Sequence, residues 1–125
     1  MASKPANAVQ KKWMSDIAEF INEESLGILY PDYEGDIRFE LHHVLGRSAK
    51  HNKVSIGHEF IIPVPKELHE IKSNHPNNVS YFKKNFVKAH GDQRGIFQCL
   101  ISCMAQWGYE TPDMDIYNAI MDTNA

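Results

Sequence analysis

The sequence has few cysteines and no long hydrophobic run, and each shortage excludes a class of protein. Its 125 residues include 2 cysteines, Cys99 and Cys103, which stand four positions apart in a helix-like segment. That spacing is poor for a disulfide, and no CxxC zinc-finger spacing is present, so we expect two buried, reduced cysteines. No apolar stretch is long enough to cross a membrane, and the polar start from Met1 to Gln10 does not resemble a secretory signal. We therefore expect a cytoplasmic protein with no membrane partner.

Positive charge is also scarce when it is summed over the chain. The 13 lysines and arginines are outnumbered by 16 acidic residues, which gives a formal net charge of −3. This sum provides no overall attraction to nucleic acid. The basic residues are nevertheless concentrated in two places, which are Arg38, Arg47, Lys50 and Lys53, with Glu40 as the one acid among them, and Lys83, Lys84 and Lys88. A phosphate-binding surface, if present, is expected at one of these places.

The length fits one domain, residues 1–125, with a core of its own. Hydrophobic periodicity and turn residues predict an α+β fold, in which a β-hairpin and a crossing helix are packed with N- and C-terminal helices. The large aromatic residues are expected to pack in the core: Trp13, Phe20, Phe82, Phe86, Phe97 and Trp107. The predicted elements are a helix over Ala6–Glu23, strands over Asp36–Val44 and His58–Pro63 joined by a polar loop, and helices over Lys66–Ser73, from Asn78 or Ser80 to Gly91, over Asp92–Trp107 and over Thr111–Asp122.

Five of the seven histidines fall within the predicted strand–loop–strand–helix unit, and four of them are at places that could converge. His42 and His43 end the first strand, His58 begins the second, and His69 lies in the following helix. A helix packed across a hairpin brings these positions together. An imidazole with a pKa near neutrality can take a proton from water, and others can hold a metal ion that stabilises charge on a phosphate. Because neighbouring strand residues point to opposite faces, we expect His42 and His43 to have different tasks.

Two motifs in this unit resemble those of known nucleases. The segment ELHH, followed by a polar loop and by FIIPVPK leading to His69, resembles the HNH or ββα-metal motif of colicin-type DNases. HHVLGR and IGHEFIIPVPKELH, followed by Phe86–Gly91 and Gln93, resemble the small phage proteins of the Ref-like family, which are RecA-dependent nucleases. The resemblance extends roughly from Trp13 to Leu100. Each motif alone is weakly specific, and the two motifs together are moderately specific.

The resemblance implies a metal-dependent endonuclease that hydrolyses DNA phosphodiester bonds, of phage or prophage type and associated with recombination. It implies one divalent ion, which would be Mg²⁺, Mn²⁺, Zn²⁺ or Ni²⁺. His43 would be the general base, and the metal ligands would be His42, His58 and His69. His58 also lies near the position of the motif's central asparagine, where it would orient the base instead of binding metal. DNA and a recombinase filament are the implied partners.

The loop between the two predicted strands supplies the residues expected to contact DNA. Arg47 could hold the scissile phosphate through two hydrogen bonds, which is the advantage of a guanidinium over an ammonium group. It is therefore predicted to take part in catalysis. Lys50 and Lys53 follow in the same loop and are predicted to contact phosphates of the nucleic acid.

Two departures from the family pattern keep other interpretations open. Ref-like relatives often carry a cysteine pair before the two histidines, whereas residues 25–30 contain none. The colicin pattern has a second histidine in the helix, at the position occupied here by Ser73. A nucleic-acid-binding or recombination-accessory protein that has lost catalysis, or a zinc-stabilised interaction domain, would also fit. The strandedness of the substrate and the oligomeric state are left open.

Overall fold

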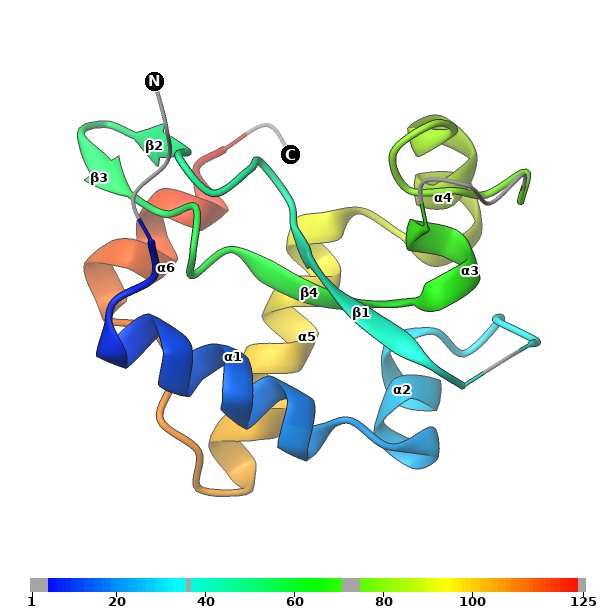
Figure 1. Cartoon of the computed structure of the whole chain (residues 1–125), viewed down its shortest axis with the longest axis horizontal. Coiled ribbons are helices and arrows are strands. Elements are labelled where there is room, and N and C mark those ends of the chain that lie inside the picture. The colour runs from blue at the N-terminus through cyan, green and yellow to red at the C-terminus, as the bar shows by residue number, and fades with distance from the viewer. Residues whose placement is uncertain (1–4, 36, 71–74, 124–125) are drawn as a thin grey trace.

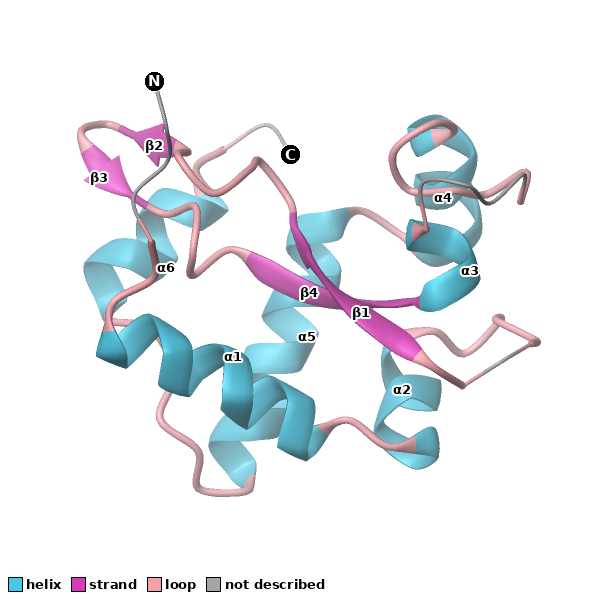
Figure 2. Cartoon of the chain, in the orientation of Figure 1, coloured by secondary structure: helices cyan, strands magenta, loops and turns pink. Residues whose placement is uncertain are grey.

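The protein has a mixed α+β fold in which helices surround two small antiparallel sheets (Figures 1 and 2). The computed structural model describes residues 5–35, 37–70 and 75–123. The elements in chain order are α1 (Ala8–Phe20), α2 (Glu23–Leu29), β1 (Phe39–His43), β2 (Lys50–His51), β3 (Val54–Ser55), β4 (Ile61–Pro65), α3 (Lys66–His69), α4 (Lys83–His90), α5 (Gln93–Gln106) and α6 (Met114–Met121). No helix in these ranges is both long and apolar enough to span a lipid bilayer.

The central feature is a two-stranded antiparallel ribbon made by β1 and β4, which Figure 1 shows crossing the middle of the molecule. The register pairs His42 with Ile62 and His43 with Ile61. All five residues of β4 are buried, whereas those of β1 are half-buried, so β1 is the more accessible strand. Helix α3 begins directly after β4 and packs against both strands. The predicted order of hairpin and following helix is therefore present.

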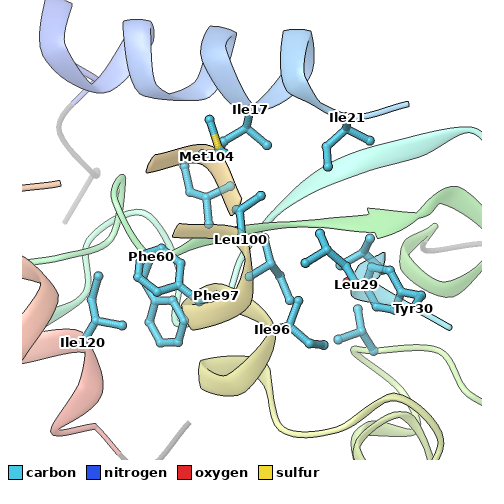
Figure 3. Packing of buried hydrophobic residues seen from close by; sticks show 14 of the residues in the cluster. Ile17, Ile21, Leu29, Tyr30, Phe60, Ile96, Phe97, Leu100, Met104 and Ile120 are labelled. Carbon is cyan, nitrogen blue, oxygen red and sulfur yellow. The ribbon is translucent and has the colours of Figure 1, made fainter. Parts of the chain in front are cut away.

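The core lies between this ribbon and the helices α1 and α5, as the side chains in Figure 3 show. Helix α1 buries Trp13 and Ile17 and begins with a capping box between Asn7 and Gln10. The Trp13 indole donates a hydrogen bond to the backbone carbonyl of Glu59, 3.1 Å away, which ties α1 to the segment that leads into β4. The fully buried residues of largest volume are Tyr30, Phe60, Phe86 and Phe97.

The loop between β1 and β4 contains a second hairpin, β2–β3, that the sequence did not predict. Asn52 and Lys53 form its turn with φ angles of 51° and 69°, the left-handed values of a two-residue type I′ turn. The hairpin is attached to the end of α6, where His51 Nε2 lies 2.8 Å from Asp122 Oδ2. The polar loop thus contains regular structure that is attached to the end of α6.

Several predicted boundaries and burials differ from the structure. The first helix ends at Phe20, and a separate short helix, α2, follows it. The second strand runs from Ile61 to Pro65 and not from His58, which lies in the turn before it. Two aromatic residues expected in the core are exposed, since Phe82 keeps 45% and Trp107 77% of its accessible surface. The helix predicted over Lys66–Ser73 ends at His69, because the backbone of Glu70 is extended, and residues 71–73 lie outside the described residues.

Candidate functional site

The four histidines predicted to act together lie in two pairs at the end of β1. The ring centroids of His42 and His69 are 5.0 Å apart, and those of His43 and His58 are 5.4 Å apart. His42 and His43 are adjacent in the strand, so their side chains leave it on opposite faces, as predicted. The site therefore has two halves with different surroundings.

The first half contains a carboxylate as well as two imidazoles. Glu40 lies two residues before His42 and therefore on the same face of β1. Its Oε1 is 2.9 Å from Nδ1 of His69. A carboxylate on one ring nitrogen fixes the orientation of an imidazole and leaves its other nitrogen available as a metal ligand. Glu40 is thus a positioning residue that the sequence analysis did not single out.

His42 is held in its neutral form. Burial lowers its pKa to about 4, and the neighbouring His69, His43 and Lys83 act in the same direction, while the Gln93 side chain opposes them. Gln93 is only 2% exposed, and within the described part of the chain its Oε1 has no hydrogen-bond partner. Although the Gln93 amide lies near the imidazole, its oxygen does not meet the geometry of a hydrogen bond. A neutral imidazole is the form that binds metal.

This shift in pKa predicts a pH-dependent stability. Between pH 6.5 and about 4 the unfolded chain protonates His42 and the folded protein does not, so the free energy of unfolding falls as the pH falls through this window. His42 alone should lower the free energy of unfolding by about 3 kcal/mol across this window. Urea unfolding of metal-free protein at pH 7, 5.5 and 4.5 measures this change in the free energy of unfolding. The variant His42→Gln should show a shallower pH dependence of the free energy of unfolding than the wild type; equal slopes for the two proteins would contradict the assignment.

The second half of the site opens into a pocket beside α1. His43, His58 and Arg47 line this pocket of about 400 Å³ together with residues from the start of the chain, among them Lys11. Burial lowers the pKa of His43, and Arg47, His58 and His69 lower it further. His43 Nε2 is buried and, among the described residues, has no hydrogen-bond partner. His43 is therefore neutral near pH 7 and can accept a proton.

The pocket is also suited to an anion. Lys11 and Arg47 contribute positive charge, and none of the acidic side chains that the structure describes contributes to the lining. Lys11 lies on α1, 32 positions before His43, and sequence reasoning missed it because Lys11 and Lys12 look like an ordinary solvated helix face. Lys50 and Lys53, predicted to contact DNA, do not line the pocket; both are exposed on the β2–β3 hairpin.

The position of Arg47 depends on a close backbone contact with Gly57. A Cβ added to Gly57 would lie 2.1 Å from the carbonyl oxygen of Arg47 and 2.6 Å from that of Gly46. The backbone N–H groups of Ile56 and Gly57 both donate to the carbonyl oxygen of Ala49. The segment that carries Arg47 is therefore held directly against the segment that carries His58.

The structure brings together two of the three residues predicted as metal ligands. His42 and His69 are together, and His58 lies against His43 instead. Two imidazoles that share one tetrahedral ion have ring centroids roughly 5 Å apart, because each metal–nitrogen bond is ~2.0–2.1 Å long. The His42–His69 pair fits this spacing. Within residues 5–35, 37–70 and 75–123, no group of three or more histidine, cysteine, aspartate or glutamate side chains is placed to hold one ion. A metal bound by the pair would therefore keep coordination positions for water or substrate.

The other histidines lie outside this cluster. His51 contacts Asp122, and His75 Nδ1 accepts a hydrogen bond from the backbone N–H of Asn77. His90 packs against the rings of Tyr30 and Phe86. Compared with known proteins, the chain matches no family model, no curated protein and no solved structure.

Proposed function

We propose that the protein is a metal-dependent HNH-type endonuclease that hydrolyses phosphodiester bonds in DNA. The observation that supports this best is the arrangement at the end of β1, where a carboxylate-supported imidazole pair lies beside a second imidazole pair that lines a cationic pocket. Metal-assisted hydrolysis of a phosphodiester can combine a metal ion with a general base at one phosphate, and the charge of His69 reaches His43, where it helps to lower the pKa of His43. The proposal includes the cytoplasm of a bacterial host as the location, a phage or prophage origin, and a recombinase filament as a partner.

The residues of the pocket would bind the phosphate and the attacking water. Lys11 and Arg47 neutralise the phosphate, and the Arg47 guanidinium can donate two hydrogen bonds to it. His43, neutral near pH 7, takes the proton of the water as that water attacks the phosphorus in line with the leaving oxygen. His58, against the His43 ring, orients the base. Lys50 and Lys53 extend the contact to neighbouring phosphates.

The other half of the site would hold the divalent ion. His42 and His69 are the ligands, and Glu40 keeps the His69 ring in place. Imidazole ligands favour Zn²⁺, Mn²⁺ or Ni²⁺ over Mg²⁺, which prefers carboxylates and water. When bound, the ion supplies positive charge that stabilises the transition state and the leaving oxygen.

The test is cleavage of supercoiled plasmid and of single-stranded DNA after chelation and re-addition of each of the four ions. We expect cleavage to require a metal. Glu40→Gln should raise the metal concentration for half-maximal cleavage by about 10- to 100-fold, because loss of a supporting carboxylate weakens metal binding by that factor. The matched control is His51→Ala, which removes a histidine outside the cluster and should leave this concentration unchanged. Cleavage in the presence of excess chelator, or equal metal requirements for Glu40→Gln and wild type, would count against the proposal.

A second candidate is a nucleic-acid-binding or recombination-accessory protein with the same fold and no catalysis. The net charge of −3 and the two-histidine donor set favour it. It predicts DNA binding that weakens with salt, with no cleavage under any ion. A zinc-stabilised interaction domain predicts instead a large fall in the melting temperature on chelation, since structural metal sites contribute to folding directly.

A further inference from the structure

A second pocket lies away from the histidines and is lined by residues from the end of α1, from α2 and from the end of α5. Its volume is about 370 Å³. Aromatic side chains of Phe20, Trp107 and Tyr109 contribute to its lining, together with the carboxylates of Glu19 and Glu24. None of the residues proposed to cleave DNA takes part in it.

Trp107 is exposed although its backbone is fixed. It is the C-cap residue of α5, and its N–H donates to the carbonyl oxygen of Met104, 3.1 Å away. Gly108 follows with φ of 86°, and the Tyr109 N–H bonds back to the same Met104 oxygen, which is a glycine-terminated helix end. The indole nevertheless keeps 77% of its accessible surface. An exposed tryptophan on a backbone that hydrogen bonds hold in place is typical of the anchor residues of protein interfaces.

The charge around this indole is negative. Glu19 and Glu24 line the pocket, and no lysine, arginine or histidine within residues 5–35, 37–70 and 75–123 does. Glu19 Oε1 accepts a hydrogen bond of 3.2 Å from the Tyr109 hydroxyl, whose ring packs edge-on against Phe20 at 5.9 Å. Desolvation raises the pKa of the Tyr109 hydroxyl, and the carboxylates of Glu19 and Asp16 raise it further, so the charge of Asp16 also reaches this pocket. This field repels phosphate, so the pocket does not extend a DNA-binding surface.

We propose that this pocket binds an arginine side chain from a basic, partly apolar segment of a partner protein. Aromatic ring faces attract cations, and a planar guanidinium can stack on an indole while it donates two hydrogen bonds to a carboxylate. Apolar residues beside the arginine would cover Ile28, which lines the same pocket and is 54% exposed. The inference does not depend on the nuclease activity, since it rests on residues outside that site.

Trp107 itself reports on binding, because the only other tryptophan, Trp13, is 5% exposed. The probe is an acetylated, amidated Leu-Arg-Leu peptide, titrated against the full chain up to ~10 mM while tryptophan emission and its quenching by acrylamide are followed. The same peptide with citrulline, which keeps the shape of arginine without its charge, is the matched ligand. We expect the arginine peptide to shift the emission of Trp107 and to protect its indole from quenching by acrylamide. The citrulline peptide should bind at least tenfold more weakly.

The protein variants provide a second comparison. Glu19→Gln combined with Glu24→Gln should weaken binding of the arginine peptide about tenfold or more. Glu23→Gln should leave this affinity unchanged, because Glu23 lies in the same helical turn as Glu24 but outside the pocket lining. DNA cleavage should be unchanged in all of these variants. No response of Trp107, equal binding of the two peptides, or equal losses in the Glu23 and the paired variants would overturn the proposal. So would a peptide-free dimer in sedimentation equilibrium with Trp107 protected from acrylamide, because the pocket would then be occupied by a second copy.

Discussion

Replacement of His43 by alanine is expected to reduce metal-dependent cleavage by about 10²- to 10⁴-fold, the usual contribution of a general base. Binding of DNA should change little, because Lys11 and Arg47 still line the pocket. The physical reason is that the variant removes a neutral, half-buried imidazole, whose Nε2 has no hydrogen-bond partner among the described residues, from beside the phosphate-binding groups. Single-turnover cleavage and fluorescence anisotropy of labelled DNA, at one salt concentration, measure the two quantities separately.

Two further measurements distinguish a base from a residue that only supports the fold. Imidazole added to the buffer should restore part of the lost rate in His43→Ala and none in Lys11→Ala, which loses phosphate binding instead. Because the pKa of His43 is lowered, the wild-type rate should decline only below pH 6.5, the ordinary value of histidine. A residual rate within a few-fold of wild type, or parallel losses of binding and cleavage, would show that His43 is not the base.

The sequence predicted the parts of the fold that have a long, regular pattern. Helix α5 lies within the predicted range, with Asp92 as a side-chain cap and Gly108 after its end. Helix α1 was also found, since Trp13 and Ile17 repeat at helical spacing and are buried. Helical spacing also placed Trp107 in the core, which was wrong, because spacing identifies a face of a helix and cannot tell whether another element covers that face.

Short elements and prolines account for most of what was missed. Helix α2 has seven residues, too few to establish a period, and its Gly27 argues against a helix. The β2–β3 hairpin has strands of two residues, and its turn places Lys53 where glycine is usual. Strand β4 contains Pro63 and Pro65, which disfavour a strand, yet both fit opposite β1.

The candidate site was predicted in part, for a similar reason. The alternation of side chains along a strand correctly separated His42 from His43, and their partners His69 and His58 were both named. The pairing itself required the register of β1 with β4 and the direction of α3, which no local pattern contains. Lys11 and Gln93 join the site only through tertiary packing, from helices at opposite ends of the chain.

Gly57→Ala tests whether this packing positions the site, and we expect it to destabilise the protein by about 3 kcal/mol, at the upper end for inserting a methyl group into a packed region. The added Cβ would lie 2.1 Å from the carbonyl oxygen and 2.4 Å from the carbonyl carbon of Arg47, so backbone must move, and a flexible side chain cannot give way instead. Arg47 would move with it, and cleavage by the molecules that remain folded should fall as well. Urea unfolding at pH 7 gives the free energy.

The matched substitution is Gly95→Ala in α5, where an added Cβ meets nothing within 4 Å. It makes the same chemical change and should stabilise the protein by up to about 1 kcal/mol, because alanine is the better helix former. The two variants are therefore expected to move the free energy of unfolding in opposite directions. If the free energy of unfolding of Gly57→Ala were within ~0.5 kcal/mol of the wild-type value, the contact between Gly57 and Arg47 would not be what holds the loop. Arg47 would then need another means of reaching the pocket that His43 and His58 line.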